Sequence, residues 1–320
     1  QLGDVRRPLL VGGFWAAAGA AIIALAPDPV SLAVAVGVWA SGMAGIIPLI
    51  DSRTVELMGG SPNRYGRARA WGSVAFVGVA LLTGAIIDRT SPRILFALWA
   101  PTLALTGVVA YRVLGGGSSG GSTRRLRVTR ADVVGLVRLP RLGLFLVGAI
   151  GFWTTNTAVA AFLSIHMTNL GAPAQLVGAA WAVGATVEVP LMLAFPTIAG
   201  RLGSERLLVI ASAAYVARAI GFALAPTPVA LVALSALSGV GYAFFYVGSV
   251  TYVARHAPAR LRATAQGVFT GTANSIGMIV GSLAGGVVAS AITIPGMYAV
   301  AAAGSAVAGL IVARAVLGRQ

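Results

Sequence analysis

The sequence predicts an all-α protein that crosses a membrane many times, and three observations support this fold class. Of 320 residues, 58% are hydrophobic and only 10% are charged, whereas soluble domains carry about 25% charged residues. Apolar runs long enough to cross a bilayer follow one another along the chain. Two charged residues, Glu188 and Arg218, lie inside consecutive runs of this kind. Because lipid leaves a single span no other way to satisfy its backbone, each run should be a helix.

Proline, glycine and arginine separate the apolar runs and set their expected bounds. The expected helices lie near residues 9–26, 29–50, 70–88, 93–113, 142–166, 175–198, 206–225, 228–250, 265–290 and 295–317. They divide the chain into three parts, which are a partial N-terminal bundle of four helices (1–113), a cytoplasmic linker (114–140) and a C-terminal bundle of six helices (141–320).

The expected linker consists of two parts that differ in amino-acid composition. It starts with GGGSSGGS, which is typical of a flexible connector. It continues as RRLRVTRADVVGLVRLP, and this arginine-rich part could lie on an anionic membrane surface. A solvated connector is the simpler interpretation of the same residues.

The net charge of +15 comes from 23 arginines without any lysine. Nucleic-acid binding would require these residues to cluster on a soluble face, but nearly all lie in short connections between apolar runs. Twenty of them fall on one side of the predicted membrane, and only Arg89 and Arg93 fall on the other. The positive-inside rule therefore predicts that both termini are cytoplasmic. We expect a multi-pass monomer in the inner (plasma) membrane, with the lipid bilayer as its surroundings.

Several kinds of chemistry have no support in the sequence. Cysteine is absent, so disulfides, metal thiolates and a catalytic thiol are excluded. Neither His166 nor His256 has other metal-binding residues nearby in the sequence. No GxSxG, HExxH, P-loop or GxGxxG motif occurs in a strand–helix setting. We therefore expect no enzyme activity, no metal site and no cofactor.

Three segments carry the most informative motifs: PLIDSRTVELMGGSPNRYGRARAWGSVAF, AYVARAIGFALAP and SVTYVARHAPARLRATAQGVF. All three resemble the major facilitator superfamily, specifically its branch of lactose and phenylpropionate permeases. The resemblance implies the major facilitator fold, which is built from two six-helix halves. The opening QLGDVRRPLL resembles the loop between the second and third helices of that fold. About ten of twelve helices would then be present, and the chain would be truncated at its N-terminus.

The resemblance implies a first group of site residues. Asp51 and Arg69 match the acid and the arginine that hold the sugar in lactose permease, and Phe76 stands where that permease has the tryptophan that stacks against the sugar. An arginine opposite a carboxylate can bind hydroxyl groups or an organic anion with fixed geometry. The alternative is a salt bridge that fixes the helix ends, for which Arg67 is an equally suitable partner.

Glu188 and Arg218 are the second group. A charge at bilayer depth is costly, so such residues are usually paired or face water, and they mark transport pathways. Arg218 also matches the arginine of the ninth helix in the resembled branch. A carboxyl group that alternates between a protonated and an arginine-paired form could couple transport to protons. The alternative is a static buried ion pair that fixes helix register.

Other residues are weaker candidates. Trp153 and Asn156 could line the cavity, although a polar contact between helices is as good an explanation. The aromatic residues Tyr242, Phe245 and Tyr246 are expected mainly to pack. A repeat of glycines every four residues indicates close helix packing, and it comprises Gly277, Gly281 and Gly285. The tenth-helix lysine, histidine and acid of lactose permease correspond here to Ser235, Ser238 and Gly241, so the lactose-type proton relay is not expected.

These observations predict secondary active transport, with proton-coupled symport of a small organic solute such as a sugar, a nucleoside or an aromatic acid. The solute would bind at mid-membrane between the two halves, and Glu188 would be the protonation switch. The residues expected to contact the solute or shape its site are Asp51, Arg69, Phe76, Trp153, Asn156 and Arg218. Two alternatives remain, a proton-antiport exporter of hydrophobic compounds and a membrane protein that does not transport (a sensor or a degenerate relic).

Overall fold

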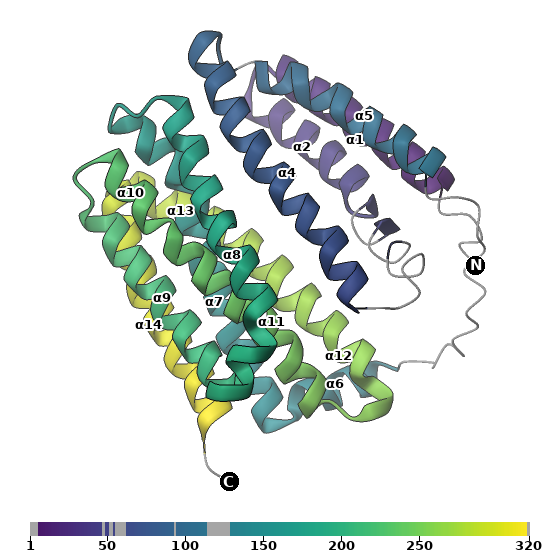
Figure 1. Ribbon diagram of the computed structural model, residues 1–320, viewed down its shortest axis with the longest axis vertical. Coiled ribbons are helices and arrows are strands. Elements are labelled where there is room, and N and C mark those ends of the chain that lie inside the picture. Colours follow the sequence, from purple (N-terminus) through teal and green to yellow (C-terminus); the bar gives the residue numbers. More distant parts are fainter. Residues whose placement is uncertain are drawn as a thin grey trace. The chain divides into compact units, whose positions relative to one another are not determined.

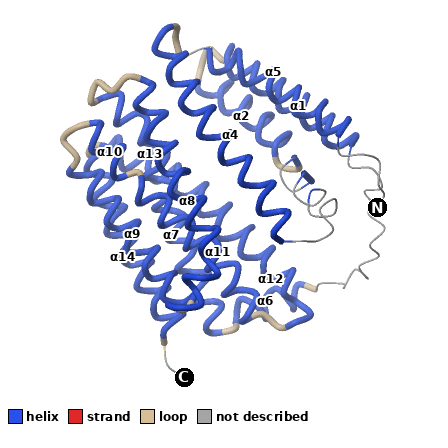
Figure 2. Tube along the Cα trace, viewed as in Figure 1, coloured by secondary structure: helices blue, strands red, loops and turns tan. Residues whose placement is uncertain are grey.

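The computed structural model describes residues 6–46, 49–50, 54, 62–92, 94–113 and 129–318, without the side chains of 62–70 and 263. Among these residues every regular element is a helix (Figure 2). Nine helices in the described part of the chain are long and apolar enough to cross a membrane, and Pro29–Met43 is a shorter apolar helix. The predicted all-α membrane fold is therefore confirmed.

The chain forms two compact units, residues 1–72 with 85–125, and residues 73–84 with 126–320. In the first unit the central helix is α1, which packs against both α2 and α5. Its Gly19 lies against the backbone of Trp39, where a Cβ atom would clash. The helices concerned are α1 (Arg6–Leu25), α2 (Pro29–Met43), α5 (Ile94–Val113) and the two ends of α4 (Pro62–Arg89).

The second unit is a bundle around α7, which packs against α13 and α14 (Figure 1). In the same unit α9 packs against α11 and α14, and α8 packs against α11. Its elements are α6 (Arg130–Arg138), α7 (Pro140–Asn169), α8 (Ala174–Leu202), α9 (Ser204–Leu224), α10 (Pro228–Leu234), α11 (Ala236–His256), the 3₁₀ turn η1 (Ala259–Leu261), α12 (Arg262–Phe269), the π-helical η2 (Thr270–Ile276), α13 (Gly277–Ala291) and α14 (Ile294–Leu317).

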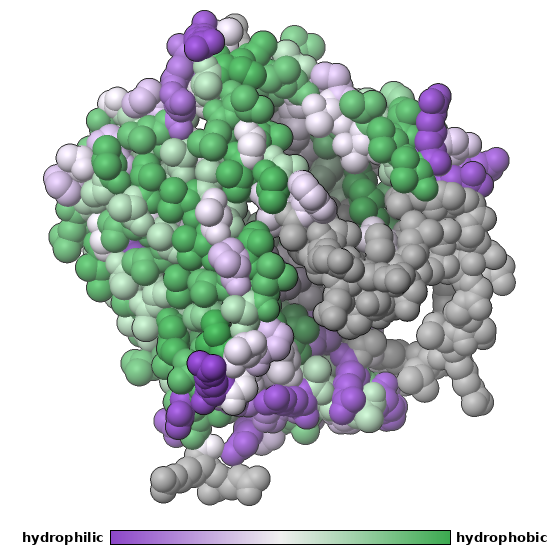
Figure 3. Space-filling view, viewed as in Figure 1, coloured by the Kyte–Doolittle hydropathy of each residue, from purple (hydrophilic) through white to green (hydrophobic). Residues whose placement is uncertain are grey.

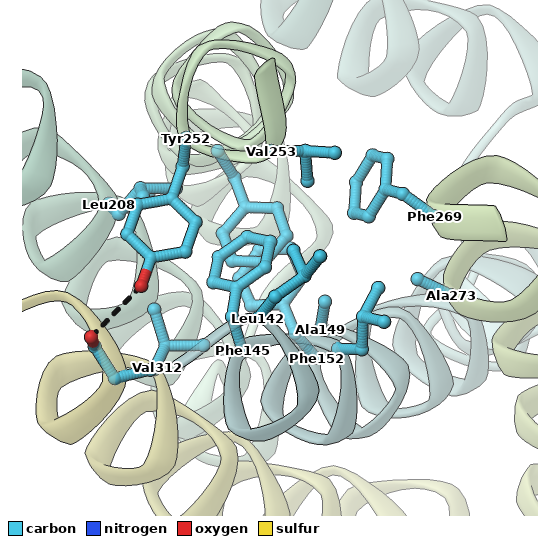
Figure 4. Packing of buried hydrophobic residues seen from close by; sticks show 14 of the residues in the cluster. Leu142, Phe145, Ala149, Phe152, Leu208, Tyr252, Val253, Phe269, Ala273 and Val312 are labelled. Carbon is cyan, nitrogen blue, oxygen red and sulfur yellow. Dashed lines mark hydrogen bonds between the residues drawn. The ribbon is translucent and has the colours of Figure 1, made fainter. Parts of the chain in front are cut away.

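Aromatic side chains form the core of this unit. Phe152 of α7 stacks on Phe245 of α11 with ring centroids 3.4 Å apart, and both are almost fully buried. Phe145 lies against Tyr252, whose hydroxyl donates a hydrogen bond to the carbonyl of Ala315 at 3.0 Å (Figure 4). These contacts hold α7, α11 and α14 together. The polar side chains farther along α7 therefore project from a helix whose position is fixed by core packing.

Two predicted helix bounds were wrong. The second helix was expected to reach residue 50, but α2 ends at Met43 and a turn follows at residues 44–45. The third was expected to start at residue 70, but α4 starts at Pro62 and includes Arg64, Arg67 and Arg69. Proline suits the first turn of a helix, and arginine is a good helix former. The helix therefore begins well before its apolar part.

A helix also forms inside the expected linker. α6 begins after Thr129, whose hydroxyl accepts a hydrogen bond from the backbone N–H of Asp132 at 3.2 Å. The Asp132 carboxylate accepts one in return from the Thr129 backbone at 3.0 Å, which completes a capping box. Arg260 of η1 forms a salt bridge with the same carboxylate, and Leu136 is buried in the core. This part of the linker is thus fixed to the second unit.

The surface of the second unit suits a lipid environment. In Figure 3, hydrophobic residues cover most of its visible face around α9 and α11, and hydrophilic residues gather at the end where α6 and α12 lie. Exposed arginines at this end include Arg138, Arg206 and Arg260. An apolar waist with basic residues at one end is the distribution that membrane proteins show.

Candidate functional site

The second unit contains a cavity of about 270 Å³. Its wall comes mainly from α7, α8, α9 and α11, with Phe76 added by the part of α4 that belongs to this unit. Both charged residues singled out in the sequence, Glu188 and Arg218, line it. The other lining residues that carry polar or aromatic groups are Asn156, Trp181, Tyr215, Phe222, Ser235, Ser238 and Tyr242.

Arg218 is the most strongly held of these residues, and only 4% of it is exposed. Its guanidinium donates hydrogen bonds to Asn156 Oδ1 and to Ser238 Oγ, both at 2.8 Å. It also lies over the ring of Tyr215, 4.5 Å from the centroid, a cation–π arrangement that stabilises a desolvated cation. Its Nε has no hydrogen-bond partner among the described residues. Three helices thus fix a buried cation in the cavity wall.

Glu188 is half-buried on α8 and faces the same cavity. Its backbone comes close to α11, because a Cβ atom at Gly239 would lie 2.8 Å from the Glu188 nitrogen. Gly239 adjoins Ser238, which accepts a hydrogen bond from Arg218. The close crossing of α8 and α11 therefore brings the acid next to the hydrogen-bond network of Arg218. The cavity holds one acidic and one basic side chain.

The remaining predicted site residues differ in where they lie. Phe76 and Asn156 line the cavity with the charged pair, whereas Trp153 lines a neighbouring cavity. Asp51 is outside the described residues, and Arg69 belongs to α4 without a described side chain. The Asp51–Arg69 pair therefore stays a prediction, as do the roles assigned to all these residues in binding.

Several lining residues were not proposed from the sequence. Trp181 precedes Glu188 by seven residues, and Tyr215 precedes Arg218 by three. Ser238 is recognisable in the sequence only as a departure from lactose permease. Residues three, four or seven positions apart share one face of a helix. The helical spacing from the two charged residues was therefore the signal that could have identified Trp181 and Tyr215.

The predicted packing roles are largely confirmed. Phe245 is fully buried in the core, and Tyr246 stacks on Tyr242 with centroids 5.5 Å apart. Tyr242 also lines the cavity, so it does more than pack. The glycines of α13 allow the close approach of α7 that was expected, because a Cβ atom at Gly281 would run into the carbonyl of Thr154.

Within the described ranges, no group of three or more His, Asp or Glu side chains is placed to hold a metal ion. The two histidines instead pack against aromatic rings. His166 lies edge-on to Tyr298, with centroids 5.4 Å apart, and His256 stacks on Tyr252 at 4.0 Å. The cavity is thus built from hydrogen-bonding, charged and aromatic groups, which suit reversible binding of an organic solute.

The chain is similar to known proteins of one family. The model of the MFS_1 like family matches residues 10–297. Maltose permease of Geobacillus stearothermophilus is 26% identical over 245 residues, which cover 76% of this chain and 61% of the permease. The uncharacterized transporter YwbF of Bacillus subtilis is 24% identical over 265 residues, with coverage of 81% and 64%. The chain thus spans less than two thirds of the length of these relatives.

Solved structures share the fold. The nucleoside transporter NupG superposes with a TM-score of 0.79 at 16% identity, over 99% of this chain and 84% of NupG. A peptide transporter of the POT type in complex with alafosfalin gives a TM-score of 0.71 at 14% identity, with coverage of 99% and 81%. These relatives and neighbours are transporters rather than enzymes. The narrower resemblance to the lactose and phenylpropionate permease branch stays a prediction. Because the family model covers most of the sequence, the chain belongs to the MFS_1 like family and is a membrane protein with the major facilitator fold.

Proposed function

We propose that this protein is a secondary active transporter that moves a small polar organic solute by alternating access, driven by the proton gradient. The observation that carries the proposal is the position of Arg218 and Glu188 on the wall of one cavity. Ionisable residues at membrane depth are costly and mark substrate or proton pathways. The names of the relatives, a maltose permease and a nucleoside transporter, support a polar solute.

Arg218 and Asn156 would bind the polar part of the solute. Arg218 is held in place by hydrogen bonds to Asn156 and Ser238, so little side-chain freedom is lost when a ligand binds beside it. The aromatic side chains of Phe76, Trp181 and Tyr242 supply apolar walls. A hydroxyl-rich or planar ring compound matches this lining, which supports a sugar, a nucleoside or an aromatic acid.

Glu188 would couple solute movement to protons. When its carboxyl group is ionised, the cavity contains one negative and one positive side chain, and protonation leaves the positive charge of Arg218 uncompensated. A buried, uncompensated charge is strongly unfavourable. Protonation of Glu188 therefore favours a solute that brings hydrogen-bond acceptors to Arg218, which links proton binding to solute binding.

The test is transport by the purified chain in proteoliposomes, with a panel of sugars, nucleosides and aromatic acids. Glu188→Gln should abolish accumulation driven by a pH gradient and leave solute counterflow intact. Glu205→Gln is the matched control, because Glu205 bonds to Ser204 and Arg255 at the start of α9, away from the cavity. Accumulation that survives in Glu188→Gln removes Glu188 as the switch, and wild-type affinity in Arg218→Ala removes Arg218 from the site.

The direction of proton flow decides between the two kinds of coupling. Solute uptake that alkalinises the external medium supports symport, whereas solute extrusion coupled to proton entry supports the exporter of hydrophobic compounds. Failure of every panel member to move in either direction supports the non-transporting alternative. The basic end of the second unit, which holds α6 and α12, supports a cytoplasmic location for that end, and the division of the arginines along the sequence supports the same location for both termini.

A further inference from the structure

A second cavity of about 320 Å³ adjoins the first. It is lined by residues of α7 and α8 and by Met278 of α13. The two cavities share Asn156, Ala160 and Trp181 in their walls, so they meet along one edge of α7 and one side chain of α8. Each volume is near the lower end of the range of about 300–1,000 Å³ that ligand pockets occupy, whereas the two together fall well inside it.

Trp181 is the side chain that stands at this junction. Trp181 lines both cavities, and 39% of the residue is exposed. The indole N–H donates a long hydrogen bond of 3.4 Å to Ser164 Oγ, and this bond connects α8 to α7. A hydrogen bond of this length is weak, so it holds the indole ring of Trp181 near α7 without fixing the orientation of the ring.

The two cavities differ in chemistry. The first contains the ionisable side chains of Glu188 and Arg218, whereas the described wall of the second contains none and presents Trp153, Trp181 and Met278. An indole face binds a planar or puckered ring by stacking, and its N–H serves one hydrogen bond. The first cavity, whose wall also contains the aromatic rings of Phe76 and Tyr242, therefore suits the more polar ring of a solute, and the second suits a less polar ring.

We propose that the two cavities form one site with two subsites, which takes a solute built of two linked rings, and that Trp181 determines this specificity by lying at the junction. Asn156 reaches both subsites, and its amide group orients the solute where the two rings join. The inference rests on the proposed transport of a polar organic solute and specifies the size and shape of that solute. A single-ring compound would fill one subsite and leave the other without contacts.

The experiment measures equilibrium binding to the full chain in detergent by calorimetry, with two matched pairs of probes. Maltose is compared with glucose, and adenosine with adenine. In at least one pair the two-ring compound should bind roughly tenfold more tightly, which is the effect of one additional stacked ring. Trp181→Ala should reduce this ratio to about one. Trp71→Ala is the matched control, because Trp71 is 74% exposed on α4 and lines neither cavity.

A second variant keeps the inference testable if Trp181→Ala does not fold. Met278 is 52% exposed and lines only the second cavity, so Met278→Trp should fill that subsite without disturbing the first. It should weaken the two-ring probe and leave the affinity for glucose, the polar single-ring probe that suits the first cavity, unchanged. Equal affinities within both pairs, no binding by any probe, or an unchanged ratio in the variants would overturn the inference.

The result separates this inference from the proposed function. A two-ring preference that disappears in the variants, together with no proton-driven accumulation in vesicles, leaves the subsites standing and removes the transport proposal. Proton-driven accumulation of a single-ring solute, together with no preference for two-ring compounds in the binding experiment, supports the transport proposal and removes the two-subsite inference.

Discussion

Arg218 on α9 donates a hydrogen bond to Asn156 on α7 at 2.8 Å, although both helices pack mainly against α14. The bond joins two neighbours of α14 through polar atoms at the cavity wall. Bonds between a charged donor and a neutral acceptor contribute more than neutral pairs, and they contribute most where water is excluded. The cavity is therefore shaped by a polar contact as well as by the aromatic core.

The first prediction removes the acceptor of this bond. Asn156→Ala should lower the free energy of unfolding by about 1–3 kcal/mol, because a buried charged donor loses its partner. Denaturant titration in detergent micelles measures the change. Thr157→Ala is the matched control, since it changes the next residue of α7, which lines only the second cavity. An equal loss in both variants would show that the hydrogen bond contributes nothing of its own.

The second prediction concerns the core. Tyr252 is 2% exposed, and its hydroxyl donates to the Ala315 carbonyl at 3.0 Å. Tyr252→Phe keeps the packing and leaves that carbonyl without its partner, so we expect a loss of about 1–3 kcal/mol in unfolding free energy. Tyr246→Phe should change stability much less, because Tyr246 is half-buried and its ring stacks on Tyr242. A neutral Tyr252→Phe variant would contradict the assigned role of the bond.

The helices could be predicted because every span must be apolar over the thickness of the lipid. The ends of these helices could not be predicted in the same way. A helix can extend beyond its apolar part wherever the adjoining residues favour helix formation, whether or not lipid surrounds those residues. α4 shows this, because it starts at Pro62 and passes through three arginines before its apolar part. α6 shows it again, because Asp132 and Thr129 form a capping box within a sequence that resembled a connector by its composition.

The charged members of the site could be recognised because burying a charge is costly and therefore rare. Their neutral neighbours could not be distinguished in the same way. Trp181 and Tyr215 are aromatic residues of a kind that any packed helix face contains. Only their helical spacing from Glu188 and Arg218 distinguishes them from other aromatic residues in the sequence. Asn156 accepts a hydrogen bond from Arg218 because the packing of α7 and α9 against α14 brings their side chains together. This packing depends on the whole bundle, so it cannot be deduced from the sequence of α7 or α9 alone.

The third prediction tests the close crossing of α7 and α13. A Cβ atom at Gly281 would run into the carbonyl of Thr154, so Gly281→Ala should force the helices apart. We expect a loss of about 1–3 kcal/mol in unfolding free energy, which is typical of overpacking. Gly286→Ala is the matched control on the same helix, since its nearest neighbour would be Phe162 at 3.9 Å. Equal stabilities of the two variants would mean that the crossing adapts without strain.

The fourth prediction concerns the pH dependence of α6. Hydrogen bonds from the Thr129 backbone and hydroxyl, followed by the interactions with Arg260, lower the pKa of Asp132 from 3.8 to about 2. A carboxyl group with a depressed pKa contributes stability that is fully present above its unfolded value and is lost as the pH falls through the folded value. The attachment of α6 to η1 should therefore be unchanged from neutral pH down to about pH 4 and weaken between pH 4 and pH 2.

The carboxyl signal of Asp132 in NMR spectra, assigned by its loss in Asp132→Asn, measures this pKa directly. Thr129→Ala removes one of the Thr129 hydrogen bonds and should raise the pKa, and Arg260→Gln should also raise it, because both remove interactions that favour the ionised form. Each variant should leave the pKa below its ordinary value, since the backbone N–H of Thr129 is present in both. A wild-type pKa near 3.8 would show that the capping box and the Arg260 contact are absent in solution, and α6 would then be a loose connector, as its composition first indicated.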